Sequence, residues 1–283
     1  MTGNGTRVLI TGASGFIGSA LMRQLKPLKP LGIGLPPEAS STEHMFRVVD
    51  LRHEDKVESL LSEFVPDVVF HLAALTSPQR NEDDPESAEA CNVHATRNLL
   101  KYLSPEAHII FPSTDKVFNG SELYPDESAA THPLWKYGIF KLECERLIRQ
   151  HTNLYHIFRL PIVHSFGEHK LLSGDHASGS YIDQSMRQLH AGGSVNIFRN
   201  VERCFLKLHE LIQLFELSLR DSHFGIYHAG SIMYSYYDRL IAVRKEKNIK
   251  WQSKLNVIEG QAKPLIQNLN TGKLKRVFGV AFT

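Results

Sequence analysis

Two side chains that could transfer a proton stand four residues apart near the middle of the sequence. Tyr137 and Lys141 lie in a stretch, residues 134–150, that predicts a helix, and their spacing puts both on one helix face. A free phenol has a pKa of about 10 and is a poor acid or base near neutral pH. A lysine ammonium beside it stabilises the tyrosinate and lowers that pKa. An isolated pair at this spacing usually belongs to a solvated helix surface, so the surrounding elements decide its role.

A glycine-rich turn near the start of the sequence could hold a phosphate group. The apolar run at residues 8–10 predicts a buried strand, Gly12, Gly15 and Gly18 follow it, and apolar residues then recur at helical spacing. Free N–H groups at a helix N-terminus and the helix dipole both favour an anion there. A TGxxGxxG turn between a strand and a helix therefore predicts a dinucleotide-binding site.

A hydroxyl group follows a strand on the N-terminal side of the Tyr–Lys helix. Residues 108–118 predict a strand that runs into Ser113, Thr114 and Asp115. A hydroxyl at such a strand end and Tyr137 can converge on one point above a nicotinamide ring. This set suits the reduction of a ketone, because the cofactor supplies the hydride, Tyr137 the proton, and Thr114 a hydrogen bond as charge develops on the oxygen.

Strands and helices alternate up to about residue 160 and must position these groups. Further strands are predicted at residues 31–35, 46–51, 67–74 and 156–160, and helices at 53–64 and 86–103. The alternation predicts an α/β fold, a Rossmann-type doubly wound parallel sheet covered by helices on both faces. Open parallel sheets bind ligands at their carboxyl edge, where the small Ala73 and Ala74 leave room for a flat ligand.

The strand–helix rhythm weakens after Pro161. Residues 165–180 predict a loop, and the later elements are a helix at 181–190, a strand at 195–198, helices at 208–219 and 234–247, and a short final helix capped by Thr271. A strand at 225–229 returns to the sheet. We therefore expect a dinucleotide-binding domain of residues 1–162, with 197–230 returning to it, and a smaller C-terminal substrate-binding lobe of residues 163–196 and 231–283.

The end of the second strand bears on the choice of cofactor. An acidic residue usually holds the adenosine ribose about 20 residues after the glycines, but Pro36 stands there and Glu38 lies beyond two prolines. No arginine takes the place expected for a 2′-phosphate contact, whereas Ser40 and Ser41 could donate hydrogen bonds. The sequence favours NADP, with NAD as the alternative.

Composition and charge exclude several other classes of protein. The chain has 283 residues, 42% of them hydrophobic and 22% charged, which is ordinary for a globular protein. A net charge of +2 without a long basic run gives no reason to expect nucleic acid as a partner. No apolar run approaches the ~18 residues of a membrane helix. The polar N-terminus and three scattered cysteines predict a cytoplasmic, reducing location, and the His164–His169 pair lacks a third metal ligand.

These motifs resemble the extended short-chain dehydrogenase/reductases that act on nucleotide sugars, and most closely the dTDP-4-dehydrorhamnose reductase branch. The resemblance runs in the right order across nearly the whole chain. It is carried by TGASGFIG at 11–18, DL at 50–51, HLAA at 71–74, NVHATRNLL at 92–100, STDKVFNG at 113–120, YGIFKLECE at 137–145, FRLPIV at 158–163 and NLNTGKLKRVFG at 268–279.

This resemblance implies roles for individual residues. Tyr137 becomes the proton donor, Lys141 its partner on the cofactor side, and Thr114 the third catalytic hydroxyl, with Ser113 a neighbour. The implied cofactor contacts are Gly12, Ser14, Gly15, Phe16, Ile17, Gly18, Asp50, Leu51, Leu72, Ala73, Ala74, Tyr137 and Lys141.

Asp115, Lys116 and Arg203 fall where the resemblance implies contacts to the substrate. An arginine at the position of Arg203 can bind a pyrophosphate through two parallel hydrogen bonds. Lys116 replaces a residue that is usually aromatic in the reductases, and His209 replaces a usual Asp. In the related 4,6-dehydratases a Glu at the position of Lys116 acts as acid and base, so dehydration is not expected.

The resemblance implies NAD(P)H-dependent reduction of a nucleotide-linked 4-keto-6-deoxy sugar. Two alternatives stay open. One is a nucleotide-sugar 4-epimerase, which would retain its cofactor between turnovers. The other is a non-catalytic NAD(P)-binding regulatory subunit, against which the intact set of Thr114, Tyr137 and Lys141 argues. The expected partner is a nucleotide sugar, with no nucleic acid, membrane or metal, and a homodimer is the assembly to test for.

Overall fold

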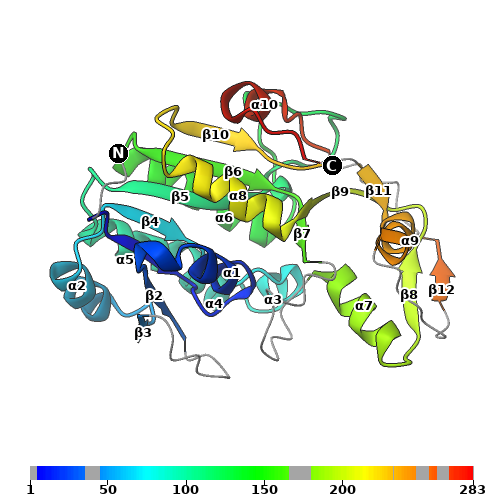
Figure 1. The fold of residues 1–283 in the computed structure, drawn as a ribbon, viewed down its shortest axis with the longest axis horizontal. Helices are drawn as coiled ribbons and strands as arrows, with labels where there is room; N and C mark the ends of the chain where they lie inside the picture. The colour runs from blue at the N-terminus through cyan, green and yellow to red at the C-terminus, as the bar shows by residue number, and fades with distance from the viewer. Residues whose placement is uncertain are drawn as a thin grey trace.

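A seven-stranded parallel sheet runs through the middle of the molecule (Figure 1). Its strand order is β10-β6-β5-β4-β1-β2-β3, and each neighbouring pair is parallel. This topology confirms the predicted Rossmann-type doubly wound sheet. The computed structural model describes residues 5–35, 45–165, 180–231, 233–246, 255–259 and 268–282. The strands are β1 (Val8–Thr11), β2 (Leu31–Gly34), β3 (Phe46–Val48), β4 (Val68–His71), β5 (His108–Thr114), β6 (Tyr155–Leu160) and β10 (Gly225–His228).

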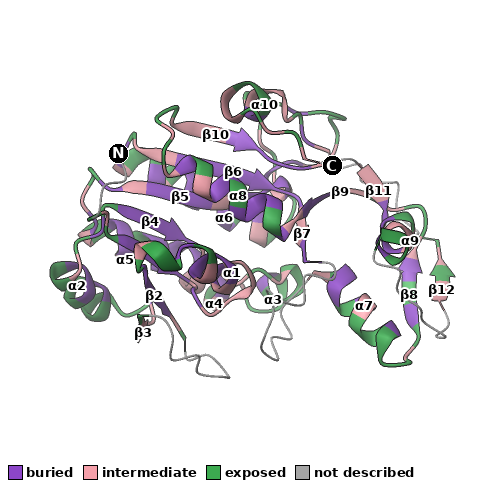
Figure 2. Cartoon of the chain, viewed as in Figure 1, coloured by how far each residue is buried: buried purple, intermediate pink, exposed green. Residues whose placement is uncertain are grey.

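Helices cover both faces of this sheet, and strand residues alternate between two cores. Val8 and Ile10 pack with α1 and α8 on one face, whereas Leu9 packs with α2, α5 and α6 on the other. Figure 2 shows the inner strands β1, β4 and β6 almost wholly buried, as expected where both faces of a parallel sheet are covered. The helices are α1 (Phe16–Gln24), α2 (Glu54–Glu63), α5 (Ala95–Tyr102), α6 (Lys136–His151) and α8 (Leu208–Ser218).

Two small sheets form a separate layer beyond the carboxyl end of β6, with a core that includes Ile182, Ile197, Phe205 and Leu240 (Figure 1). In one sheet β9 lies between β7 and β11, and in the other β8 pairs with β12. Residues 197–230 were predicted to return to the dinucleotide-binding domain. Within them, α8 and β10 lie on the main sheet, whereas β9 lies in this layer. The division of the chain into two domains stays a prediction. The elements are β7 (Ile162–His164), α7 (Tyr181–His190), β8 (Val195–Phe198), β9 (Glu202–Lys207), β11 (Met233–Ser235), α9 (Tyr236–Glu246) and β12 (Leu255–Ile258).

Three predicted strands end earlier than their apolar patterns indicated. β3, β4 and β5 end at Val48, His71 and Thr114, whereas the sequence predicted ends at 51, 74 and 118. Beyond each end the chain leaves the sheet to turn at the carboxyl edge. After β5, for example, Thr114 caps the short 3-10 turn η3 (Asp115–Val117). The residues wrongly assigned to strands therefore lie in turns at this edge, where Asp50 and Ala73 are partly exposed and Val117 and Phe118 are buried.

Several short elements were missed by the sequence patterns, among them β7, β9, β11 and β12. Another is α3 (Pro78–Asp83), which begins with a proline behind a capping serine. The Ser77 Oγ accepts a hydrogen bond from the Arg80 N–H at 3.3 Å. Ser followed by Pro is a recognised start of a helix, so the sequence did contain a signal for α3.

The helix predicted at 86–103 is divided by a π turn. It consists of α4 (Pro85–Glu89), the π turn η2 (Ala90–His94) and then α5. At the other end of the chain α10 (Gly272–Phe278) forms as predicted, but its expected cap is wrong. Among the described residues it is Asn270, rather than Thr271, whose side chain accepts the Gly272 N–H, at 2.9 Å.

Parts of two predictions lie outside the described residues. Nearly all of the loop predicted at 165–180 does so, together with His169. The predicted ribose position is also outside them, with Pro36, Glu38, Ser40 and Ser41.

Two buried histidines make the fold sensitive to acid. Burial lowers the pKa of His71 and of His228 to about 3, against about 6.5 for an exposed imidazole. Both side chains are therefore neutral in the folded protein, whereas the unfolded chain binds more protons below pH 6.5. Their contribution to stability is complete above that pH and is lost as the pH falls toward 3.

We expect each imidazole to lower the free energy of unfolding by about 2 kcal/mol at pH 5. Urea unfolding of the wild type and of His228→Gln at pH 7.5 and pH 5 measures this effect. The free energy of unfolding should fall less in the variant than in the wild type when the pH is lowered from 7.5 to 5. His53→Gln is the control, because His53 is exposed, and it should keep the wild-type difference. An equal loss in the wild type and His228→Gln would refute the assignment.

Candidate active site

The glycine turn after β1 brings two backbone segments into direct contact. Gly12 has a φ of 65°, and a Cβ atom there would lie 2.7 Å from the Ala73 backbone nitrogen. A Cβ on Gly18 would overlap the carbonyl oxygen of Gly12. Ser14 ties the turn to the end of β2 through a hydrogen bond from its Oγ to the Leu35 carbonyl, at 3.2 Å. The turn is thus closed by contacts that only glycine permits, as a phosphate-binding turn requires.

Predicted site residues line up along the carboxyl edge of the sheet in strand order. They are the catalytic candidate Thr114 at β5 and the cofactor contacts Ala73 after β4, Gly12 after β1 and Asp50 after β3, while Leu35, which accepts the Ser14 hydrogen bond, follows β2. Neighbouring strands are about 4.8 Å apart, so the line from β5 to β3 spans roughly 19 Å. An extended ligand with an anionic middle section fits this order, because the start of α1 lies at its centre.

The other predicted cofactor contacts differ in exposure. Asp50 holds Arg52 through both carboxylate oxygens, at 2.6–3.0 Å, and these bonds keep the pKa of Asp50 below its usual value. Leu51 is buried in the second core. Phe16, Ile17 and Leu72 are partly buried and pack on the first core.

Tyr137 is held against the strand end that carries Thr114. A Cβ on the next residue, Gly138, would overlap the Lys116 carbonyl oxygen, so the first turn of α6 lies directly on η3. Sequence reasoning missed Gly138, although a glycine inside a helix costs about 1 kcal/mol and asks for a reason. Close backbone contact with Lys116 supplies that reason.

Lys141 is buried beneath this turn. Its side chain is 3% exposed, and Nζ lies 3.8 Å from the centre of the Phe111 ring on β5. Burial lowers the pKa of Lys141 to about 8. The ring face partly offsets the cost of burying the ammonium. A solvated Tyr–Lys surface pair is therefore excluded.

The structure corrects the expected pKa of Tyr137. The sequence predicts that Lys141, together with the positive charge of the nicotinamide, lowers the phenol pKa, whereas burial and, next, the charge of Asp115 raise it above its ordinary value. The phenol is therefore protonated at neutral pH, which is the form that donates a proton to a ketone oxygen.

The Thr114 hydroxyl is oriented by two neighbours. Its Oγ1 accepts the Lys116 N–H at 3.2 Å and donates to Asp115 Oδ1 at 3.2 Å. Both Thr114 and Asp115 are buried. The Asp115 carboxylate therefore sets the direction in which the Thr114 hydroxyl proton points. Thr114 must break this hydrogen bond before it can donate to a bound carbonyl.

Arg203 lies across from this group, on β9 of the small layer. The phenol of Tyr236, the first residue of α9, lies within electrostatic range of both Arg203 and Asp115. The pKa of Tyr236 is raised chiefly by burial. Tyr236 packs edge-on against Tyr181 and Phe205. Tyr236 is therefore a further candidate substrate contact beside Asp115 and Arg203. No sequence motif indicated it.

The described part of the chain contains no group of three His, Cys, Asp or Glu side chains that could hold a metal ion. None of its helices is both long and apolar enough to cross a membrane. All three cysteines are free thiols.

Residues 8–230 match the model of the NAD dependent epimerase/dehydratase family. The chain belongs to this family. Membership confirms the resemblance to extended short-chain dehydrogenase/reductases, and this family comprises NAD(P)-dependent oxidoreductases. The match covers β1 to β10, and so includes the glycine turn and the Tyr137 helix.

Two curated relatives of this epimerase/dehydratase chain share about a third of the aligned residues. A methionine adenosyltransferase 2 subunit beta from Xenopus laevis is 35% identical over 161 residues, 56% of this chain and 47% of that protein. A D-erythronate dehydrogenase from Haemophilus influenzae is 32% identical over 160 residues, 52% of this chain and 50% of that protein. The chain spans about half the length of the curated relatives it matches.

A solved structure shares the fold over the whole chain. It is a dTDP-4-dehydrorhamnose reductase from Bacillus anthracis in complex with NADP, with a TM-score of 0.82 and 19% identity. The match covers 100% of this chain and 95% of that one. At this identity the likeness shows the fold alone.

We expect Gly138→Ala to destabilise the protein by about 1–3 kcal/mol, because the added methyl group must displace α6 from η3. Helix propensity alone predicts the opposite sign, a gain of about 1 kcal/mol. Urea unfolding measures the difference. Gly5→Ala is the control, since a Cβ there meets nothing within 4 Å. A Gly138→Ala variant at least as stable as the wild type would show that α6 does not rest on this contact.

Proposed function

We propose that the chain reduces a nucleotide-linked 4-keto-6-deoxy sugar with NAD(P)H, in the manner of a dTDP-4-dehydrorhamnose reductase. The observation that carries the proposal is the placement of a protonated, partly buried phenol at the end of β5. Gly138 fixes Tyr137 against η3, and Lys141 lies one helical turn further along α6. This group lies on the same sheet edge as the Gly12 turn.

The residues present fit a dinucleotide. The Gly12 turn leaves its backbone close to Ala73, and α1 begins at Phe16 with no acidic side chain in its described first turn. Its N–H groups and dipole favour an anion. When bound, NAD(P)H supplies the hydride. Leu72 and Ala73 would lie beneath its nicotinamide half, and Asp50 near its adenine half.

The protein's own residues handle the proton and the developing charge. Tyr137 gives its phenolic proton to the ketone oxygen, while Thr114 turns from Asp115 and donates a hydrogen bond to the same oxygen. The Lys141 ammonium then stabilises the tyrosinate. Lys141 is buried and Tyr137 partly buried, and the low local dielectric strengthens these interactions.

Arg203 and Tyr236 support a phosphorylated substrate. They lie on the small layer, and the Tyr236 phenol is within electrostatic range of Asp115. A guanidinium suits the diphosphate of a nucleotide sugar. The solved reductase with the same fold acts on a substrate of this class, as its name states.

We also propose a cytoplasmic location and a homodimer.

A 4-epimerase is the first alternative, and the family name includes this activity. Such an enzyme would keep its nicotinamide cofactor from one turnover to the next. A reductase instead consumes one NAD(P)H for each sugar reduced. Measuring NADPH loss against product formation with a dTDP-4-keto-6-deoxy sugar distinguishes the two.

A non-catalytic subunit is the second alternative, favoured by the relatives named methionine adenosyltransferase 2 subunit beta. Such a chain would bind NAD(P)H and a second polypeptide, a methionine adenosyltransferase, without turning over a sugar. The complete set of Thr114, Tyr137 and Lys141 favours catalysis. NADPH binding without oxidation of NADPH by any keto sugar would favour the subunit.

Tyr137→Phe keeps the ring and removes the proton donor. We expect turnover of the keto sugar to fall by roughly 10²–10⁴ while NADPH still binds. Thr114→Val should cost less and leave cofactor affinity nearly unchanged. Lys141→Met should impair both turnover and NADPH binding. Rates at saturating NADPH and NADPH titrations of all three variants make the comparison.

The control for this series is Tyr102→Phe. Tyr102 lies on α5 and hydrogen bonds to Glu54 on the surface, so its loss should leave turnover unchanged. An unimpaired Tyr137→Phe would end the catalytic assignment.

Cofactor choice is tested separately. Pro36 takes the place of the ribose-binding acid, so no carboxylate at that position repels a 2′-phosphate. We expect NADPH to bind at least as tightly as NADH in fluorescence titrations. A strong preference for NADH would instead assign the ribose contact to Glu38.

A further inference from the structure

A line of buried hydrogen bonds runs from the glycine turn to the helix that carries Tyr137. Thr11, the residue before Gly12, lies with its Oγ1 2.9 Å from His71 Nδ1 on β4. The other ring nitrogen, Nε2, lies 2.9 Å from Thr96 Oγ1 on α5. Thr11, His71 and Thr96 are all at most 2% exposed. None of the three was singled out by the sequence motifs as a site residue.

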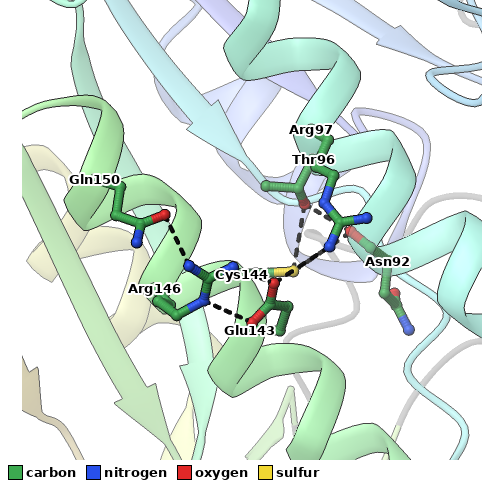
Figure 3. A network of polar contacts seen from close by, with 7 residues as sticks. All are labelled: Asn92, Thr96, Arg97, Glu143, Cys144, Arg146 and Gln150. Atoms are coloured by element: carbon green, nitrogen blue, oxygen red, sulfur yellow. Dashed lines mark hydrogen bonds and ion pairs between the residues drawn. The ribbon is translucent and has the colours of Figure 1, made fainter.

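The line continues beyond Thr96 into the π turn and α6. Thr96 Oγ1 donates to the Asn92 carbonyl at 2.6 Å. The Cys144 thiol of α6 reaches the same carbonyl at 3.4 Å. Figure 3 shows Thr96 and Cys144 turned toward each other between the two helices, with Arg97 and Glu143 paired beside them. The line therefore ends on α6, within one helical turn of Lys141.

Counting protons along the line fixes the tautomer of His71. Because Thr96 gives its only hydroxyl proton to Asn92, it must accept from His71, and Nε2 therefore carries the ring proton. Nδ1 is then an acceptor and takes the Thr11 hydroxyl proton. Thr11 Oγ1 in turn accepts the Ala73 N–H at 3.0 Å. Each donor finds one acceptor, and burial keeps the ring neutral by holding the pKa of His71 to about 3.

The near end of this line lies where the Gly12 turn meets the loop after β4. Ala73 is the residue whose backbone nitrogen faces Gly12. Its N–H is paired with Thr11 across the turn. His71 thereby sets how deeply the loop after β4 lies against the glycine turn.

We propose that His71 is a positioning residue for the dinucleotide: as the neutral Nε2–H tautomer it holds Thr11, and through it the Ala73 backbone, against the Gly12 turn. This role rests on the proposed dinucleotide site. Its effect falls on cofactor affinity and leaves the chemical step at Tyr137 unchanged. No part of His71 itself touches the reacting atoms in this account.

The first test is NADPH affinity. Thr11→Val removes the hydrogen bond to the Ala73 N–H, and His71→Phe removes the side chain that holds Thr11. Each should raise the Kd for NADPH about 10-fold, the value of one buried hydrogen bond. The rate of keto-sugar reduction at saturating NADPH should change by less than about 3-fold. The double variant should bind NADPH no more weakly than His71→Phe alone, because both changes break one line.

Ser218→Ala is the matched control. Its buried Oγ donates to the Phe215 carbonyl within α8, away from the edge. It should lower stability as Thr11→Val does and leave the Kd for NADPH unchanged. If Thr11→Val and His71→Phe also lose only stability, His71 is purely structural and the inference fails.

The second test does not depend on activity. In ¹⁵N-labelled wild-type protein, the His71 ring should show a protonated Nε2 and a bare Nδ1, and it should not titrate between pH 8 and pH 5. A protonated Nδ1, or titration in that range, would overturn the inference. Wild-type protein that shows this tautomer but binds no NADPH would refute the proposed function, and with it the cofactor role of His71.

Discussion

Close approach of backbone to backbone at the carboxyl edge of the sheet is the constraint on which the site depends. Gly12 lies against Ala73, and Gly138 lies against Lys116, at distances that a single methyl group would abolish. The first contact sets the phosphate turn relative to β4, and the second sets the Tyr137 helix relative to β5. The sheet, whose inner strands are buried on both faces, therefore fixes the position of the glycine turn relative to the Tyr137 helix.

Burial then determines which form each catalytic group takes. It opposes charge on both Tyr137 and Lys141, raising the pKa of the phenol and lowering that of the ammonium to about 8. Asp115 adds a negative charge on the substrate side, which further disfavours tyrosinate. The phenol of Tyr137 is therefore protonated at neutral pH.

Much of this arrangement could be predicted from the sequence, because its signals are local. The glycine turn, the alternation of strands and helices, and the Tyr137–Lys141 spacing each lie within a few residues. Strand ends were harder, since Val117 and Phe118 continue the apolar run after β5 while packing on Leu269 in a small separate core. The role of Gly138, the pKa of Tyr137 and the place of Tyr236 depend on residues far away in the chain. The short strands of the small layer pair with distant partners and carry almost no periodicity of their own.

A crystal structure of the protein with NADPH tests the central claim most directly. The account predicts the pyrophosphate at the N-terminus of α1 beside Gly15, and the nicotinamide ring over the loop after β4, with Tyr137 and Thr114 on its open side. The Gly12–Ala73 and Gly138–Lys116 contacts should be unchanged. The account would be contradicted by a dinucleotide bound away from the Gly12 turn. A nicotinamide ring so far from the Tyr137 and Thr114 hydroxyls that no ketone could contact all three would contradict it equally.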